Sequence, residues 1–347
     1  MYPALAVHSA LMAKVRDVDT LWVGGEGGME ESLVQRQGIP FQSIPAAGVH
    51  GVAVAALPRN FVTITRGVFA ARRVLNEFKP DVLFFTGGYV AVPMAMAGRS
   101  IASLLYVPDI EPGMALKSLA GMADVIAVTT AESQQFFNKK VYETGYPLRP
   151  DLALWDRQTA LSHLGISGDR PVLLVFGGSK GAHSLNLALM NSLRPLLEKV
   201  ELIHISGEQD WNSVKSTREQ LPVELATHYH AMPYLHEMGA ALAAADLVVS
   251  RAGAATLGEY PLFGLPAILV PYPHAWRYQK VNADYLTQRG AAIALQDHRL
   301  NDELLSTLTV LIDNPNKLKA MRAAMFELSH PRAAEKIASA LIELAGA

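Results

Sequence analysis

Residues 176–186, FGGSKGAHSLN, bring three glycines and Ser179 together between an apolar run and a helical pattern. Glycine allows close backbone approach, and N–H groups at a helix start attract anions. We therefore identify a candidate phosphate site at Gly177, Gly178, Ser179 and Gly181. The spacing matches neither G-x-G-x-x-G nor G-x-x-x-x-G-K-[ST]. From the residues alone, an ordinary strand-to-helix turn is an equally good interpretation.

Further polar residues stand near predicted strand ends or on helices. In the helix that the small-residue loop SRAGAA opens, Glu259 offers a carboxylate suited to two adjacent ribose hydroxyls, although the helix dipole alone also favours it there. Gln279 and Asn282 share one helix face, and amides suit sugar hydroxyls, although exposed amide pairs are common. The remaining candidates end N-terminal strands or stand at the hinge: Tyr89, Asp109 and Arg149. The Arg149 guanidinium suits a diphosphate, and a solvated charge is the plainer interpretation.

Short apolar runs must position these residues. They end at turn-forming residues, as parallel strands covered on both faces do: TLWVGG, DVLFFTGG, SLLYVP, DVIAVTT, PVLLVFGG, ELIHISG, DLVVSRAG and PAILVPY. Helical patterns separate them, which predicts a doubly wound α/β architecture. The length of 347 residues favours two domains. We place the boundary between residues 147 and 168, and the chain opens on a helix with no preceding strand.

Composition excludes several classes of function. The net charge is −2, and no basic block suggests a nucleic-acid partner. The chain has no cysteine, which excludes disulfides and thiolate metal sites and fits a reducing compartment. Glycine and proline interrupt the most apolar stretch, so no membrane span is expected, and no signal peptide is apparent. We expect a cytoplasmic protein.

The segment 47–75 combines apolar residues with four arginines and no acidic residue: Arg59, Arg66, Arg72 and Arg73. Such a mixture predicts a peripheral contact with anionic lipid headgroups. A core helix with a basic outer face is the other interpretation.

Together, the motifs resemble glycosyltransferase family 28 over almost the whole chain. The similarity rests on YPALAV, FKPDVLFFTGGYV, TGYPLRPD, FGGSKGAHSLN, SRAGAATLGEYPLFGLPAILVPY and QKVNA, in this order. The resemblance implies a GT-B fold, with two Rossmann-like domains facing a cleft. It places an acceptor-side domain at 1–148, a UDP-sugar domain at 149–330, and a helix returning to the first domain at 331–347.

The resemblance also implies an inverting transfer that needs no metal ion, from UDP-N-acetylglucosamine to a polyprenyl-diphosphate-linked acceptor in cell-wall synthesis. The enzyme would act peripherally at the inner membrane face. The glycine loop and Arg149 would bind the diphosphate, with Glu259 on the ribose. Further donor contacts carry over to Leu235 at uracil, to Ala255 and Thr256 at the helix start, and to Tyr278, Gln279 and Asn282 near the sugar.

The acceptor side departs from the family pattern. The family's glycine-rich loop with its histidine precedes the position of Tyr2, so we expect the first strand and that loop to be missing. The family's His-Glu-Gln-Asn stretch appears here as YVPD, which makes Asp109 a candidate general base. Two alternatives stay open. One is a family 28 transferase with a different lipid or small-molecule acceptor, and the other is a UDP-sugar-binding protein without catalysis, or one needing a partner for the loop.

Overall fold

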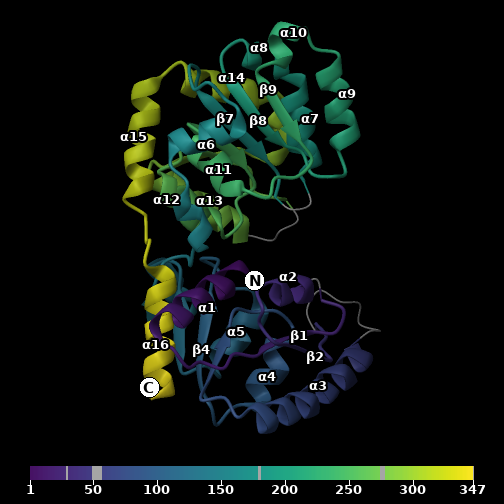
Figure 1. The fold of residues 1–347 in the computed structure, drawn as a ribbon, viewed down its shortest axis with the longest axis vertical. Helices are drawn as coiled ribbons and strands as arrows, with labels where there is room; N and C mark the ends of the chain where they lie inside the picture. The colour runs from purple at the N-terminus through teal and green to yellow at the C-terminus, as the bar shows by residue number, and fades with distance from the viewer. Residues whose placement is uncertain (29, 49–56, 179–180, 274–277, 347) are drawn as a thin grey trace. The chain divides into compact units, whose positions relative to one another are not determined.

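The computed structural model describes residues 1–28, 30–48, 57–178, 181–273 and 278–346 (Figure 1). The chain divides into two compact units. The first comprises Met1–Arg149 and Pro331–Ala347, and the second comprises Pro150–His330. This division falls one residue after the boundary between 148 and 149 expected from the sequence.

The first unit contains two parallel sheets. A two-stranded sheet pairs β1 (Trp22–Gly25) with β2 (Phe41–Ile44). A four-stranded sheet has the order β3 (Val82–Phe85), β4 (Ala102–Val107), β5 (Val125–Val128) and β6 (Val141–Glu143). Within the described ranges no pairing joins β1 to β3. The helical segments are α1 (Tyr2–Lys14), α2 (Glu30–Arg36), α3 (Leu57–Phe78), α4 (Ala91–Ala97), α5 (Met114–Ala120), η2 (Ala131–Phe136) and α16 (Ala333–Ala345).

Strand β4 explains how the four-stranded sheet is covered on both faces. Successive strand residues point to opposite faces. Leu105 and Val107 join the cluster that includes the inner face of α3, while Leu104 and Tyr106 join the cluster formed with α1 and α16. A strand buried on both faces needs a nearly continuous apolar sequence, which is what ASLLYV provides.

The second unit is built on a six-stranded parallel sheet. Its order is β12 (Ala292–Ala294), β11 (Ala267–Leu269), β10 (Leu247–Ser250), β7 (Val172–Phe176), β8 (Glu201–Ile205) and β9 (Tyr229–Met232). The helical segments are η3 (Pro150–Leu154), α6 (Arg157–Leu164), α7 (His183–Asn191), α8 (Leu193–Leu197), α9 (Trp211–Glu219), α10 (Val223–Ala226), α11 (Met238–Ala244), α12 (Thr256–Phe263), α13 (Tyr278–Gln288), η4 (Asp297–Arg299), α14 (Leu300–Ile312) and α15 (Pro315–Phe326).

The strand order of this sheet identifies where a ligand should bind. From β7 the chain proceeds outward to β8 and β9, and it then returns to β10 on the other side of β7 before continuing to β11 and β12. The direction therefore reverses between β7 and β10. In open α/β sheets the loops at the carboxyl ends of such neighbouring strands diverge and leave a crevice.

No helix within the described ranges has both the length and the apolar character needed to cross a bilayer.

Candidate functional site

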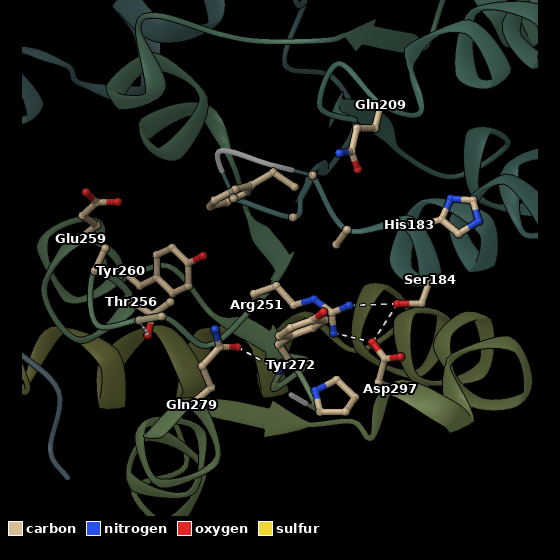
Figure 2. Close-up of a pocket in the computed structure, with 18 residues that line it drawn as sticks. His183, Ser184, Gln209, Arg251, Thr256, Glu259, Tyr260, Tyr272, Gln279 and Asp297 are labelled. Carbon is tan, nitrogen blue, oxygen red and sulfur yellow. Dashed lines mark hydrogen bonds and ion pairs between the residues drawn. The ribbon is translucent and has the colours of Figure 1, made fainter. Parts of the chain in front are cut away.

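A cavity of about 820 Å³ lies at the predicted crevice of the second unit (Figure 2). Its walls come from the loops after β7 and β10, the start of α12, and residues near the ends of β8, β11 and β12. This volume falls within the range usual for small-molecule sites. The cavity therefore forms from segments far apart in sequence that the parallel sheet brings to one edge.

The loop between β7 and α7 requires glycine at each of its three glycine positions. A Cβ on Gly177 would lie 2.3 Å from the Ala182 nitrogen, and one on Gly181 would lie 2.6 Å from the Ser206 carbonyl oxygen. Gly178 and Gly181 have φ values of +91° and +78°, which other residues rarely adopt. All three glycines line the cavity, while Ser179 lies outside the described residues.

The start of α12 forms a second wall. Ala255, Thr256 and Glu259 line the cavity, so sequence and structure bring these candidates to one site. The Thr256 hydroxyl donates to the Gly253 carbonyl at 2.8 Å, which ties the helix start to the preceding loop. Glu259 is half-buried, with its carboxylate on the same side of the cavity as Thr256 (Figure 2).

Beneath Glu259, the buried Tyr260 hydroxyl donates to the Ser250 hydroxyl at 2.6 Å. That hydroxyl in turn donates to the Arg251 carbonyl at 3.0 Å. Burial raises the pKa of Tyr260, so this pair stays uncharged and fixes α12 on the end of β10.

The remaining donor-side candidates have different surroundings. Gln279 lines the cavity, and its Oε1 accepts a hydrogen bond from the Tyr272 backbone at 2.8 Å. Asn282 is fully buried and donates to the Ala252 carbonyl at 3.2 Å, so it supports the loop after β10. Tyr278 and Leu235 are half-buried, and neither is among the residues that line the cavity.

A charged cluster that the sequence analysis missed forms another part of the cavity wall. Arg251 forms an ion pair with Asp297, and its guanidinium donates to the Ser184 hydroxyl at 2.9 Å. Ser184 donates to Asp297 at 2.7 Å, which closes the triangle (Figure 2). The guanidinium carbon lies 5.3 Å from the centre of the Tyr272 ring. The sequence contained one signal for this cluster. Arg251 directly follows β10 and stands beside the small-residue loop that opens α12.

The acceptor-side candidates belong to the first unit. Tyr89 is exposed between β3 and α4, and Asp109 is half-buried after β4. The backbone around Asp109 is fixed by two side chains of the neighbouring segment. Thr129 donates to the Pro108 carbonyl at 2.7 Å, and Ser133 donates to the Ile110 carbonyl at 2.9 Å.

Arg149 is the last residue of the segment Met1–Arg149 of the first unit, whereas the cavity is lined by residues of the second unit. Its guanidinium carbon lies 4.8 Å from the centre of the Tyr2 ring. A contact between Arg149 and a diphosphate stays a prediction.

Among the described residues, no group of three or more His, Cys, Asp or Glu side chains is arranged to hold a metal ion.

Comparisons with known proteins cover both units. The glycosyltransferase family 28 N-terminal domain matches residues 1–127, and the family 28 C-terminal domain matches residues 172–337. A relative from Roseiflexus sp. (strain RS-1) is 38% identical, over 97% of this chain and 91% of its own. One from Desulforudis audaxviator is 37% identical, over 100% and 95%. Both are named UDP-N-acetylglucosamine–N-acetylmuramyl-(pentapeptide) pyrophosphoryl-undecaprenol N-acetylglucosamine transferase.

The same architecture occurs in the crystal structure of Acinetobacter baumannii MurG, with a TM-score of 0.80 and 27% sequence identity. The match covers 99% of this chain and 95% of that one.

Proposed function

The chain belongs to glycosyltransferase family 28, and on that premise we propose that it transfers N-acetylglucosamine from UDP-N-acetylglucosamine to a lipid-linked acceptor. The relatives' names specify N-acetylmuramyl-(pentapeptide) pyrophosphoryl-undecaprenol as their acceptor. We assign the same acceptor class to this chain, which makes it an enzyme of cell-wall precursor synthesis.

One observation carries this proposal. The glycine loop, the start of α12 and Gln279 line a single cavity at the point where the strand order of the second unit reverses. Backbone N–H groups beside a helix start suit a diphosphate, a carboxylate suits a ribose diol, and an amide suits sugar hydroxyls. These are three of the four chemical parts of a UDP-sugar, and the fourth is the uracil base.

Each donor candidate then has a role. The loop of Gly177, Gly178, Ser179 and Gly181 binds the diphosphate, together with Ala255 and Thr256 at the start of α12. Glu259 accepts hydrogen bonds from the ribose hydroxyls, and Gln279 contacts the sugar. Asn282 holds the loop after β10 in place. Leu235 and Tyr278 extend the site to uracil and to the sugar, and Arg149 completes the diphosphate contacts.

In the reaction, the acceptor hydroxyl oxygen bonds to C1 of the sugar as the bond from C1 to the β-phosphate oxygen breaks. The configuration at C1 inverts, and UDP leaves with the electron pair. The donors around the diphosphate stabilise the negative charge that grows on the leaving group. The proton of the hydroxyl passes to a base, which we assign to Asp109, while Tyr89 lines the acceptor path.

Calorimetry with UDP tests the donor site directly. We expect UDP binding that UDP-N-acetylglucosamine displaces, and transfer of the sugar to a lipid-linked acceptor. ADP is the control, because its diphosphate is the same and its base is different. No heat with millimolar UDP on folded protein would contradict the proposal, and UDP binding without transfer or hydrolysis would leave only a binding protein.

The role of Asp109 is tested by Asp109→Asn, which keeps the shape of the side chain. We expect kcat to fall by about 10²- to 10⁴-fold, the usual contribution of a general base, with unchanged affinity for UDP. Full turnover in this variant would exclude Asp109 as the base.

We also propose that the outer face of α3 contacts an anionic membrane surface. Phe61 and Phe69 on this face are 70% and 65% exposed. The exposed arginines are Arg59, Arg66, Arg72 and Arg73, and α3 has no acidic residue before Glu77. Apolar rings among cations suit a lipid interface, where each arginine contributes about 1 kcal/mol. Residues 49–56 of the segment expected to bind lipid lie outside the described residues.

Vesicle flotation tests this contact. A variant with Arg66, Arg72 and Arg73 changed to Glu should lose flotation with vesicles containing phosphatidylglycerol. The matched control changes three exposed lysines of the second unit to Glu: Lys215, Lys317 and Lys319. Equal flotation of both variants would exclude α3 as the contact. A double variant, Phe61→Ser with Phe69→Ser, tests whether the exposed rings of α3 contribute to the same contact.

A further inference from the structure

A chain of buried polar side chains runs from the core of the second unit to the glycine loop. Asn186, His204 and Tyr229 are each completely buried, on α7, β8 and β9. The Asn186 amide nitrogen lies 2.8 Å from the Ser206 carbonyl oxygen and 2.7 Å from Oδ2 of Asp210. Its Oδ1 lies 3.0 Å from Nε2 of His204, and Nδ1 of His204 lies 2.7 Å from the Tyr229 hydroxyl.

The hydrogen bonds of this chain have one consistent direction. The Ser206 carbonyl and the Asp210 carboxylate only accept, so the Asn186 nitrogen donates to both. Its Oδ1 must then accept from His204, which places the imidazole proton on Nε2. Nδ1 of His204 therefore accepts from the Tyr229 hydroxyl. Burial lowers the pKa of His204 to about 4, in agreement with a neutral ring.

The outer end of the chain shapes the loop. The backbone of Gly181 approaches the Ser206 carbonyl so closely that a Cβ there would lie 2.6 Å from its oxygen. Asp210 also binds His183, the first residue of α7, at 2.7 Å through the other carboxylate oxygen. Asn186 therefore donates hydrogen bonds to the Ser206 carbonyl and to Asp210. These two groups contact Gly181 and His183, the residues on either side of Ala182, where the glycine loop leads into α7.

We propose that Asn186 is a positioning residue for the phosphate end of the cavity, an inference that rests on the proposed binding of a UDP-sugar diphosphate. It fixes the Ser206 carbonyl against Gly181 and Asp210 against His183. The backbone N–H groups at the helix mouth are then oriented before the diphosphate arrives, and binding does not have to order them.

The chemistry of the position favours asparagine. One side chain must donate two hydrogen bonds from one atom and accept a third on its other terminal atom. Aspartate would place a second carboxylate beside Asp210 and the Ser206 carbonyl. Leucine has a similar size but lacks both functions.

Two substitutions distinguish a positioning role of Asn186 from a general contribution of the buried polar chain to stability. Asn186→Leu breaks the contacts to Ser206 and Asp210, whereas Tyr229→Phe removes a buried hydrogen bond at the far end and leaves those contacts in place. Both should lower the melting temperature. Affinities for UDP and for uridine are measured for each, because uridine lacks the phosphates.

We expect Asn186→Leu to weaken UDP binding by about tenfold, the effect of losing roughly one hydrogen bond to a charged group, with uridine binding unchanged. Tyr229→Phe should leave the ratio of the two affinities at its wild-type value. If Asn186→Leu retains that ratio, or if Tyr229→Phe reduces it equally, the inference is wrong.

If Asn186→Leu does not fold, Asp210→Ala replaces it, since this change breaks the contacts to Asn186 and His183. It should reduce UDP affinity selectively, and an unchanged ratio of UDP to uridine affinity would overturn the inference. Wild-type protein that does not bind UDP would instead contradict the proposed function.

Discussion

At the residue scale, the charged side chains around the cavity lie on separate walls. Arg251 is paired with Asp297 and bound to Ser184, so its positive charge is largely balanced within the wall. A diphosphate would therefore depend on the backbone N–H groups of the glycine loop and on cations outside this cluster. Glu259 lies on another wall, away from that pair (Figure 2), and its role can be tested separately.

Replacing Glu259 with Ala should weaken UDP binding by about tenfold to a hundredfold, because hydrogen bonds to a charged group contribute roughly 1.5–3 kcal/mol. UDP analogues without the 2′ and 3′ hydroxyls should bind wild type and variant equally. Titration calorimetry with both ligands measures this difference. Glu219→Ala on α9 is the control carboxylate, and a matching loss with the dideoxy analogue would show that Glu259 does not bind the ribose.

Sequence motifs predicted the glycine loop and the residues of α12, because a loop and the helix that follows it are continuous in the chain. They did not predict the partners of Arg251. Asp297 follows β12, a strand of only three residues that the sequence did not predict, and Ser184 looks like an ordinary polar residue in a helix. Their contact depends on which strand ends the sheet brings together, and local patterns do not contain that information.

At the scale of elements, the predicted apolar runs all form strands, including the central strands of the larger sheets. The strands that the sequence did not predict are β2, β6, β9 and β12, and each stands at the edge of a sheet. Edge strands have only one neighbour and are less buried, so their sequences need fewer apolar residues. In β6 every residue is at least partly exposed, and its three-residue length gives little pattern to detect.

The buried imidazole of His204 on β8 predicts a pH dependence of stability. Its pKa is lowered from 6.5 to about 4 in the folded state. Between these values the unfolded chain binds a proton that the folded chain does not, so stability falls as the pH decreases from 6.5 to 4. The full effect is about 3 kcal/mol, at roughly 1.4 kcal/mol per pKa unit.

Urea unfolding at pH 7, 6 and 5 measures this dependence, with His204→Phe as the comparison. The variant should be less stable at pH 7, because Asn186 and Tyr229 lose their partner, but its stability should fall less between pH 6 and pH 5. Identical pH profiles would show that His204 does not cause the loss.

At the scale of the whole molecule, α16 is assigned to a unit from which it is distant in sequence. Its buried residues Ile337 and Leu341 join a cluster with Val7 of α1 and with Leu104 and Tyr106 of β4. The amphipathic pattern of α16 indicates which face is buried but not against which sheet. Only the resemblance to family 28 predicted that the helix returns to the first domain.

This assignment predicts that two similar substitutions destabilise different units. Leu341 on α16 is 3% exposed in the first unit, and Leu311 on α14 is fully buried in the second. Replacing either with Ala creates a cavity and should cost about 2–5 kcal/mol. Because each core is separate, Leu341→Ala should destabilise only the first unit and leave UDP affinity unchanged, while Leu311→Ala should destabilise only the second.

Hydrogen exchange in increasing urea, followed on peptides from each unit, measures both effects. Equal loss of protection in both units with either variant would show that the two units unfold together. It would contradict the prediction that α16 stabilises only the first unit.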